Sequence, residues 1–197
     1  MSQKSYILPA NYFSCMILGV TGNYCSGKDT IAELLKEKGF VHISLSDLIR
    51  EEAKKREITE TRENLVLLGN ELRRQHGNSI LALRAIQKMD FKKECVITSI
   101  RHPAEVEFLK KQQNFKLVQV SASQTIRWQR MQVRQANHDL KTFQDFQNWE
   151  AKEASSLNTS AQQLNTVMKM SDHIILNEES LAKLQHELDK LLKIINV

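Results

Sequence analysis

The chain has 197 residues, 41% of them hydrophobic and 26% charged, which is ordinary for a globular protein and allows one α/β domain with a sizeable core. Its three cysteines are too few for a disulfide scaffold, and no apolar run is long enough to cross a membrane, so we expect a cytoplasmic protein without a membrane partner. The net charge of +5 fits an anionic ligand, but the basic residues are not clustered with aromatic ones, so we expect no nucleic-acid partner.

Residues 1–14 give little structural signal, and Pro9 argues against a regular helix or strand there. We expect a tail or an edge segment in this stretch, followed by a single domain over residues 15–197. A secretory signal peptide is not expected, because its removal would take away the first apolar strand of that domain.

A glycine-rich loop stands between the first predicted strand, Cys15–Val20, and a predicted helix over residues 30–38. Its pattern is a glycine, four residues, and then glycine and lysine, which is typical of a phosphate-binding loop. The glycines let the backbone approach a phosphate, and the N–H groups at the helix N-terminus point at it. The alternative is an ordinary turn between a strand and a helix. The residues expected to bind the nucleotide are Gly22, Asn23, Cys25, Ser26, Gly27, Lys28, Asp29 and Thr30.

Two residues of this loop indicate catalysis and metal binding. Lys28 supplies a positive charge for the β- and γ-phosphates and is predicted to be catalytic. Asp29 stands where a Ser or Thr usually binds Mg²⁺. A carboxylate beside a triphosphate is repelled unless Mg²⁺ lies between them, so Asp29 is either a direct or water-mediated metal ligand or an acid favoured by the helix dipole. ATP and Mg²⁺ are the predicted cofactors.

The second predicted strand, Phe40–Ser44, leads directly into a helix that carries an acid and a base. Its last residues Ile43-Ser44, followed by Asp47 and Arg50, resemble the adenylate kinase family at the same point after the loop. The resemblance implies that Arg50 clamps the phosphate of the acceptor and that Asp47 orders the water shell of the metal. The alternative is an Asp–Arg pair on a solvated helix face.

Residues 45–90 are predicted to form a helical insert that binds the acceptor. Leu65, Leu68 and Leu72 recur at helical spacing, and Gly77 separates this helix from the next. Several polar residues of the insert either line an acceptor pocket or lie on the surface, and their spacing does not separate the two. They are Arg62, Asn64, Asn70, Arg73 and Arg74.

The third predicted strand covers residues 94–100, and Pro103 lies in the first turn of the helix that follows. Five short motifs around it carry a second resemblance: Thr61-Arg62-Glu63-Asn64-Leu65, Gly69-Asn70-Glu71-Leu72-Arg73, Ser99-Ile100-Arg101, Pro103-Ala104-Glu105-Val106-Glu107 and Gln162-Gln163-Leu164. Together they resemble the P-loop kinase-like domain that stands alone in archaea or is fused ahead of deoxycytidylate-deaminase-type domains. The likeness to dephospho-coenzyme A kinase is more distant.

This resemblance runs from about Met16 to the C-terminus and implies a three-layer P-loop NTPase fold with a parallel five-stranded sheet in the order 2-3-1-4-5. It also implies a deaminase-type domain as a partner in relatives. The zinc motif of that domain, His-x-Glu followed by Pro-Cys-x-x-Cys, is not in this sequence, so zinc-dependent deamination is excluded for this chain.

Thr98 departs from the pattern of the group, which usually has an Asp there as the Walker B acid that orders Mg²⁺. Either Asp29 and Asp47 supply the lost charge, or the chain binds nucleotide and turns it over slowly. Arg101 follows at the carboxyl end of the strand, where ligands bind in open parallel sheets. We predict that Arg101 is catalytic and contacts the acceptor.

A basic helix follows the fourth predicted strand, residues 115–121, and carries Arg127, Arg130 and Arg134 on one face. In kinases of this type the segment leads into a lid, here residues 127–158. Arg130 and Arg134 are therefore predicted to stabilise the transferring phosphoryl group, and the alternative is a solvated basic face.

Asn177 ends the fifth predicted strand, residues 172–177, and is a candidate contact for the base of the nucleotide. These features predict an ATP- and Mg²⁺-dependent phosphotransferase that acts on a nucleoside or deoxynucleoside monophosphate. The alternatives are a dephospho-coenzyme A kinase-like activity and a nucleotide-sensing module with little turnover.

Overall fold

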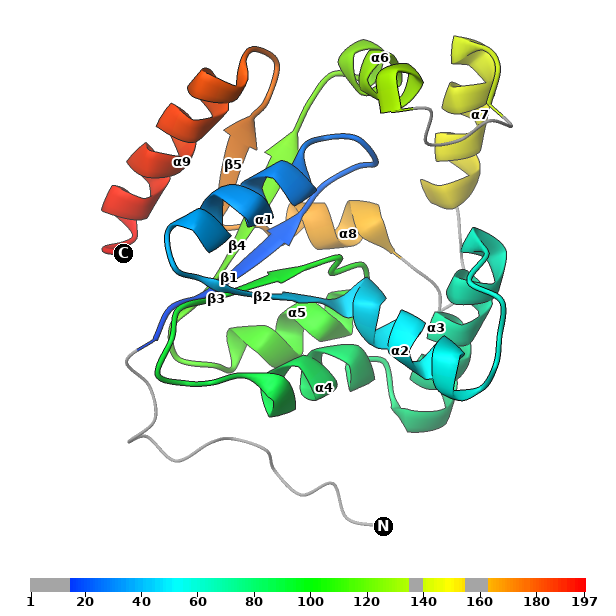
Figure 1. The fold of residues 1–197 in the computed structure, drawn as a ribbon, viewed down its shortest axis with the longest axis horizontal. Helices are drawn as coiled ribbons and strands as arrows, with labels where there is room; N and C mark the ends of the chain where they lie inside the picture. Colours follow the sequence, from blue (N-terminus) through cyan, green and yellow to red (C-terminus); the bar gives the residue numbers. More distant parts are fainter. Residues whose placement is uncertain (1–14, 135–139, 155–162) are drawn as a thin grey trace.

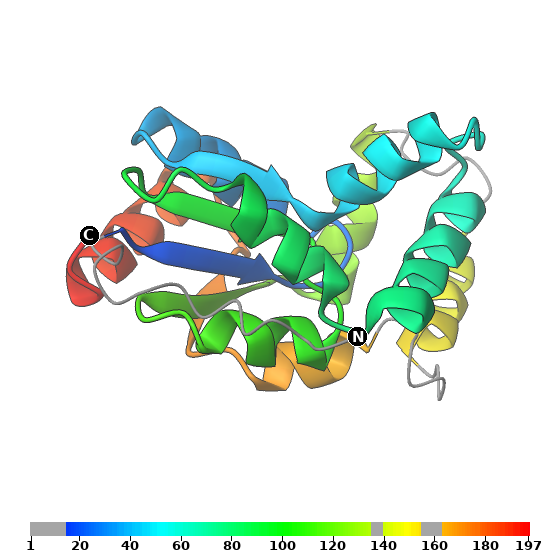
Figure 2. The ribbon, with the colours of Figure 1, turned by 90° about the horizontal axis from the view of Figure 1, so that it is seen from below.

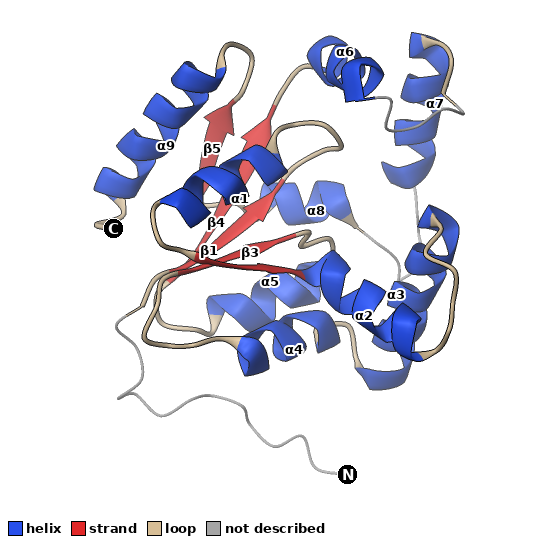
Figure 3. Ribbon diagram, viewed as in Figure 1, coloured by secondary structure: helices blue, strands red, loops and turns tan. Residues whose placement is uncertain are grey.

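The computed structural model describes residues 15–134, 140–154 and 163–197, so the predicted tail over residues 1–14 lies outside the described residues. Within these ranges the chain forms a parallel five-stranded sheet in the order β2-β3-β1-β4-β5, flanked by helices (Figure 3). The predicted α/β class and strand order are therefore confirmed. The strands are β1 (Ile17–Thr21), β2 (Val41–Ser44), β3 (Cys95–Thr98), β4 (Phe115–Ser121) and β5 (His173–Leu176).

Helices cover both faces of the sheet and give three layers (Figure 1, Figure 2). Because side chains alternate along a strand, Leu18 and Val20 of β1 pack on one face against the first and last helices, whereas Ile17 packs on the opposite face. The helices are α1 (Lys28–Glu37), α2 (Leu45–Lys55), α3 (Arg62–His76), α4 (Ile80–Lys88), α5 (Pro103–Lys110), α6 (Gln124–Arg134), α7 (Phe143–Ala154), α8 (Leu164–Lys169) and α9 (Leu181–Ile194).

The central strand sets the position of the glycine-rich loop. All five residues of β1 are buried, and Val20 near its end aligns with Thr98 of β3 on one side and with Val118 of β4 on the other. The loop that follows β1 therefore lies between the ends of these two neighbouring strands. This is the edge of the sheet at which ligands bind in open parallel α/β folds.

Two pairs of helices extend beyond the carboxyl edge of the sheet. Figure 1 shows α2 and α3 on one side of the loop and α6 and α7 on the other. The first pair falls in the predicted insert, although α4 of the same stretch packs on the sheet through Leu81 and Ile86. The second pair falls largely in the predicted lid, of which residues 135–139 and 155–158 lie outside the described residues.

Local signals place several helix ends where the sequence predicts them. Pro103 opens α5, and Gly77 with φ of 94° ends α3. Among the helices of the described ranges, none combines the length and the apolar character that a membrane crossing needs.

Candidate nucleotide-binding site

Two glycines allow the loop to pack tightly at the end of β1. Gly22 has a φ of 146° and Gly27 a φ of 105°, both in the region that favours glycine. A Cβ at Gly22 would lie 2.2 Å from the carbonyl oxygen of Val120, and a Cβ at Gly27 would lie 2.2 Å from Nδ2 of Asn177. The loop can therefore approach β4 and the segment after β5 only with glycine at both positions.

Lys28 is the first residue of α1, and its side chain reaches back over the loop, where Nζ donates a hydrogen bond to the carbonyl oxygen of Asn23 (2.7 Å). Its pKa is lowered to about 8, first by burial and next by the positive charge of Arg101. Two cationic side chains thus influence the same space at the carboxyl ends of β1 and β3. An anion bound there would be stabilised by both charges.

Ser26 is a fully buried polar residue of the glycine-rich loop. Within the described part of the chain its Oγ has no hydrogen-bond partner. A buried polar group without a partner costs about 1–3 kcal/mol, which a ligand oxygen within reach would remove. The glycine cradle, the lysine and this spare hydroxyl together fit a polyphosphate.

A cavity of about 220 Å³ lies beside the loop, between the start of α1, the helix α6 and the connection from β5 to α9. It brings residues of the glycine-rich loop together with the two predicted lid arginines and with Asn177. Its lining residues are Gly27, Thr30, Arg130, Arg134, Asn177, Glu179, Leu181 and Leu184.

Asn177 joins the loop, the helix α6 and the last strand. Its Nδ2 donates to the carbonyl oxygen of Ser26 (2.8 Å), and Nη2 of Arg130 donates to its carbonyl oxygen (2.9 Å) and to its Oδ1 (3.1 Å). Burial lowers the pKa of Arg130. The two polar atoms of the Asn177 side chain are thus engaged within the protein, while the residue still forms part of the cavity wall.

Arg127 differs from Arg130 and Arg134, although the three share one face of α6. The residue is only 4% exposed, and its Nη2 donates to Oε2 of Glu150 on α7 (2.9 Å). Its Nη1 pairs with the other oxygen of Glu150 and also reaches the carbonyl oxygen of Tyr24 in the loop (3.3 Å). Arg134 is exposed on the cavity wall. One arginine of the predicted basic face is therefore structural.

Apolar contacts also join the loop to the helices α6 and α7. Cys25 has a φ of 57° and is buried in a cluster with Phe146 of α7, and burial raises the pKa of its thiol. The ring of Trp149 meets the ring of Tyr24 edge to face, with centroids 5.4 Å apart. The guanidinium of Arg62, at the start of α3, lies 4.5 Å from the centroid of the Trp149 ring. Trp149 of α7 thus contacts both the glycine-rich loop and the start of α3.

Thr98, at the predicted Walker B position, is buried, and its Oγ1 lies 2.8 Å from Nε2 of His42. Burial lowers the pKa of His42, whereas the negative charges of Asp47, Glu33 and Asp29 act in the opposite direction. Within the described ranges, no three or more His, Cys, Asp or Glu side chains form a group that could hold a metal ion. These residues fit an Mg²⁺ ion held mainly by phosphate oxygens and water, with acids near its water shell.

Arg50, the predicted acceptor clamp, is paired within the protein. Its Nη1 donates to Oδ1 of Asp47 (2.7 Å), and its Nε lies 3.8 Å from Oε2 of Glu60. This arrangement matches the alternative interpretation of a pair on the helix face. The Arg50 side chain is 45% exposed, and exposed pairs contribute about 0–1 kcal/mol, so a phosphate can replace the carboxylate at small cost.

The structure also separates the polar residues of the insert, which their spacing left undivided. Arg73 is buried and pairs with Glu105 of α5, and Asn64 donates from Nδ2 to the carbonyl oxygen of Thr59 (2.9 Å). Arg74 is exposed. The sequence prediction gave Glu105 no role of its own, although its place three residues after the N-cap His102 is a capping signal that could have found it.

The family model described as an AAA domain matches residues 18–158, which is more than half of the chain. The chain belongs to this AAA domain family. It is 32% identical over 187 residues to a UPF0200 protein of Pyrococcus furiosus, covering 91% of this chain and 97% of the relative. This AAA domain chain is also 30% identical over 191 residues to a UPF0200/UPF0201 protein of Archaeoglobus fulgidus, with 92% of the chain but only 57% of the relative covered. The expected relationship to P-loop kinase-like proteins is therefore confirmed.

Solved kinases share the fold of this AAA domain chain. Shikimate kinase from Bacteroides thetaiotaomicron aligns with a TM-score of 0.60 and 12% identity, covering 92% of this chain and 99% of that one. A gluconokinase from Sinorhizobium meliloti aligns with a TM-score of 0.51 and 14% identity, covering 93% and 97%. At these identities the likeness shows the fold alone, which is the P-loop kinase fold.

Proposed function

We propose that this chain is an ATP- and Mg²⁺-dependent phosphotransferase whose acceptor is a nucleoside or deoxynucleoside monophosphate. The observation that carries the proposal is the glycine-rich loop, where the charges of Lys28 and Arg101 act on one space beside the buried hydroxyl of Ser26. Such a concentration of positive charge and hydrogen-bond donors favours a polyphosphate over an uncharged ligand.

The donor nucleotide would extend from the loop into the neighbouring cavity. The cavity begins at Gly27 and continues past Arg130 and Arg134 to Leu181 and Leu184 of α9. Basic groups near the loop suit the phosphates, and the leucines suit a planar base. In this arrangement Asn177 contributes to the wall and holds the loop to α6, and its part in base recognition remains a proposal.

Asp29 and Asp47 would hold Mg²⁺ through its water shell, because Asp29 lies in the first turn of α1 beside Lys28 and Asp47 lies in the first turn of α2. Bound Mg²⁺ neutralises part of the phosphate charge and orients the triphosphate. The hydroxyl of Thr98 can contact a metal-bound water but adds no negative charge. The two aspartates thus supply the charge that the Walker B position lacks.

In the transfer step an oxygen of the acceptor phosphate attacks the γ-phosphorus, and the bond to the oxygen bridging to the β-phosphate breaks, which leaves ADP. Lys28 and Arg101 stabilise the charge on the transferring group, and Arg130 and Arg134 act from the lid. Arg50 exchanges Asp47 for the acceptor phosphate. An ionised phosphate acceptor has no proton to lose, so this reaction needs no general base, unlike transfer to the hydroxyl of dephospho-coenzyme A.

Two other functions have support of their own. The distant likeness to dephospho-coenzyme A kinase favours a hydroxyl acceptor, and Thr98 favours a nucleotide-sensing module with little turnover. The protein would act in the cytoplasm, and a deaminase-type domain is a candidate partner in relatives. The fused relative from Archaeoglobus fulgidus supports the idea that this domain works beside others.

The test is ADP release from ATP and Mg²⁺ with a panel of nucleoside and deoxynucleoside monophosphates and with dephospho-coenzyme A. We expect turnover with at least one monophosphate and a loss of about 100-fold in Lys28→Ala. Lys36→Ala removes an exposed lysine from the same helix and serves as the matched control. ATP binding by calorimetry without ADP release for any acceptor would contradict the kinase and support the sensing module.

A further inference from the structure

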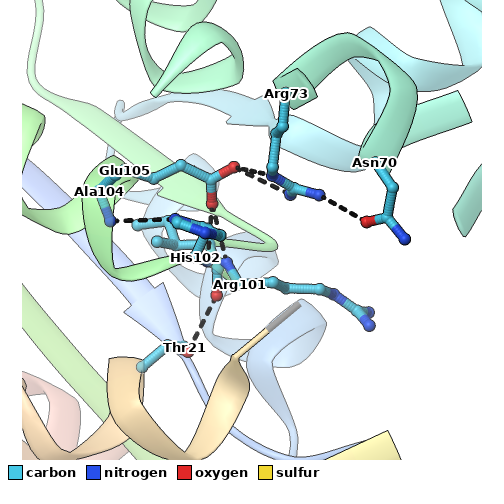
Figure 4. Close-up of polar contacts among 8 residues, drawn as sticks. Thr21, Asn70, Arg73, Arg101, His102, Ala104 and Glu105 are labelled. Carbon is cyan, nitrogen blue, oxygen red and sulfur yellow. Dashed lines mark hydrogen bonds and ion pairs between the residues drawn. The ribbon is translucent and has the colours of Figure 1, made fainter. Parts of the chain in front are cut away.

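The carboxylate of Glu105 is a buried centre of hydrogen bonds behind the proposed phosphate site. It is fully buried and accepts four hydrogen bonds, which Figure 4 shows together. Its Oε1 accepts from Nε (3.1 Å) and Nη2 (2.9 Å) of Arg73. Its Oε2 accepts from the backbone N–H groups of Arg101 (3.0 Å) and His102 (3.0 Å). One carboxylate thus joins a helix of the insert to the turn after β3.

The pair with Arg73 is well satisfied on both sides. Arg73 is 2% exposed, comes from α3, and also contacts Oδ1 of Asn70 through Nη1 (3.4 Å). A buried ion pair is costly to form unless its geometry is good, and removing one partner leaves an uncompensated charge. The two-pronged contact with Arg73 and the two backbone donors satisfy the Glu105 carboxylate. The turn therefore cannot move without disturbing α3.

Other contacts hold the same turn from its opposite side. Thr21, at the end of β1, donates from Oγ1 to the carbonyl oxygen of Ile100 (3.2 Å). Ser99 has a φ of 62°, which is unusual for a residue with a side chain. His102 caps α5 by accepting the backbone N–H of Ala104 at Nδ1 (3.1 Å). The backbone around Arg101 is thus fixed by β1, α3 and α5 at once.

The turn carries one side chain of the proposed site. In Figure 4 the guanidinium of Arg101 extends away from Glu105 and Arg73. Because Val20 aligns with Thr98 and Thr21 donates to the carbonyl oxygen of Ile100, this turn lies beside the end of β1, where the glycine-rich loop begins. The charge of Arg101 also contributes to the lowered pKa of Lys28. The buried pair and the half-buried side chain of Arg101 therefore extend in different directions from the same short piece of backbone.

We propose that Arg73 and Glu105 are positioning residues, which hold Arg101 beside Lys28 and connect the acceptor-side helix α3 to the place where the phosphoryl group is bound. This inference rests on the proposed function, but the contacts of Arg73 and Glu105 are the same whichever acceptor is used. A ligand that moves α3 acts on Arg101 through this pair. The competing view is that the pair stabilises the fold only.

A double-mutant cycle separates the two views, with inorganic tripolyphosphate as the probe in calorimetry. We expect Arg101→Met to weaken binding about tenfold and Glu105→Gln to weaken it by a similar factor. Because Glu105 acts through Arg101, the double variant should bind about as weakly as Arg101→Met alone. Losses that multiply to about 100-fold would overturn the proposal, since the two residues would then act independently.

Asp172→Asn is the matched control for a loss of stability without a loss of positioning. Asp172 also joins a backbone N–H, that of Leu117 (2.7 Å), to a cation, Lys110 (3.2 Å), but it lies at the start of β5, at the opposite edge of the sheet. Thermal unfolding of each variant shows whether it is folded at the temperature of the binding experiment. If Glu105→Gln does not fold, Arg73→Lys replaces it, because lysine keeps the charge and loses the planar fork.

A second measurement does not depend on any ligand. The pKa of the Lys28 side chain is followed by NMR, with Lys28→Met to assign its signal. Removing the negative charge of Glu105 would by itself lower that pKa, whereas withdrawal of Arg101 raises it, so the two effects have opposite signs. We expect a rise in Glu105→Gln that approaches the rise in Arg101→Met, and no rise in Asp172→Asn. A fall or no change in Glu105→Gln would overturn the proposal. If the natural chain fails to bind tripolyphosphate, the proposed function fails and this titration alone decides the positioning role.

Discussion

Replacing Lys28 by methionine tests the electrostatic basis of the site. The pKa of this lysine falls from 10.5 to about 8 because the side chain is buried near the charge of Arg101. A fall of this size corresponds to about 3 kcal/mol, and because Lys28 is half-buried rather than fully enclosed, solvent screening reduces the effect to about 2 kcal/mol. Methionine also removes the hydrogen bond to Asn23, which contributes about 1 kcal/mol.

The sign of the effect depends on pH. Below about pH 8, Lys28 is charged in the folded and in the unfolded chain, so the folded state carries the full cost of burying the charge. Between about pH 8 and 10.5 the folded chain loses this charge first, and the cost disappears. We expect Lys28→Met to be more stable than the natural chain by about 1 kcal/mol at neutral pH and less stable by about 1 kcal/mol near pH 10.5.

Urea unfolding of both chains across this pH range measures the difference directly. Lys36→Met, which removes an exposed lysine from the same helix, is measured in parallel and is expected to change stability by less than about 0.5 kcal/mol. Saturating ATP should stabilise the natural chain and have little effect on Lys28→Met. A Lys28→Met chain that is less stable than the natural one at every pH would refute the reasoning.

Three further substitutions test other parts of the site. Thr98→Asp places a carboxylate against His42, so we expect the pKa of His42 to rise in NMR titration. We expect turnover to change less than about threefold, because Asp29 and Asp47 already supply negative charge, and a large gain in turnover would favour the sensing module. Asn177→Ala removes the hydrogen bonds that link the loop to α6, and we expect it to lower the free energy of unfolding in urea by about 2 kcal/mol. We also expect weaker ATP binding in calorimetry, and an unchanged affinity would contradict the role of this link. Glu150→Gln removes the negative charge that compensates the buried guanidinium of Arg127 and should cost about 3 kcal/mol in urea unfolding. Removing the arginine as well should recover part of this loss, and equal losses in the single and double variants would argue against the pair.

Sequence reasoning was most successful where the signal is local. The apolar run before the glycine-rich loop, the proline that opens α5 and the glycine that ends α3 each act within one turn of backbone, so their structural consequences can be predicted from a few neighbouring residues. The alternation of strands and helices predicted the layered parallel sheet, because parallel strands need a crossover between them. The strand order came from the resemblance.

The roles of the arginines show where such reasoning ends. Arg127 and Arg130 have the same chemistry and lie on the same face of one helix, yet one is buried against Glu150 and the other lies at the cavity. Arg73 is likewise indistinguishable from Arg74 by spacing, but only Arg73 meets Glu105, 32 residues further along the chain. Burial is decided by helices distant in sequence, so the periodicity of one helix cannot predict it.

The placement of Cys25 makes the reactivity of its thiol a measure of how α6 and α7 open away from the glycine-rich loop. The described cysteines, Cys15, Cys25 and Cys95, are all buried, but only Cys25 is enclosed between the loop and the lid helices, whereas Cys15 and Cys95 belong to the core beneath the sheet. We expect a thiol reagent to react with Cys25 only when α6 and α7 move away from the loop, because burial raises the pKa of its thiol and suppresses the thiolate. The rate at which the Cys25 thiol is modified should therefore report how often α6 and α7 move away from the loop. A nucleotide that holds these helices against the loop should lower that rate.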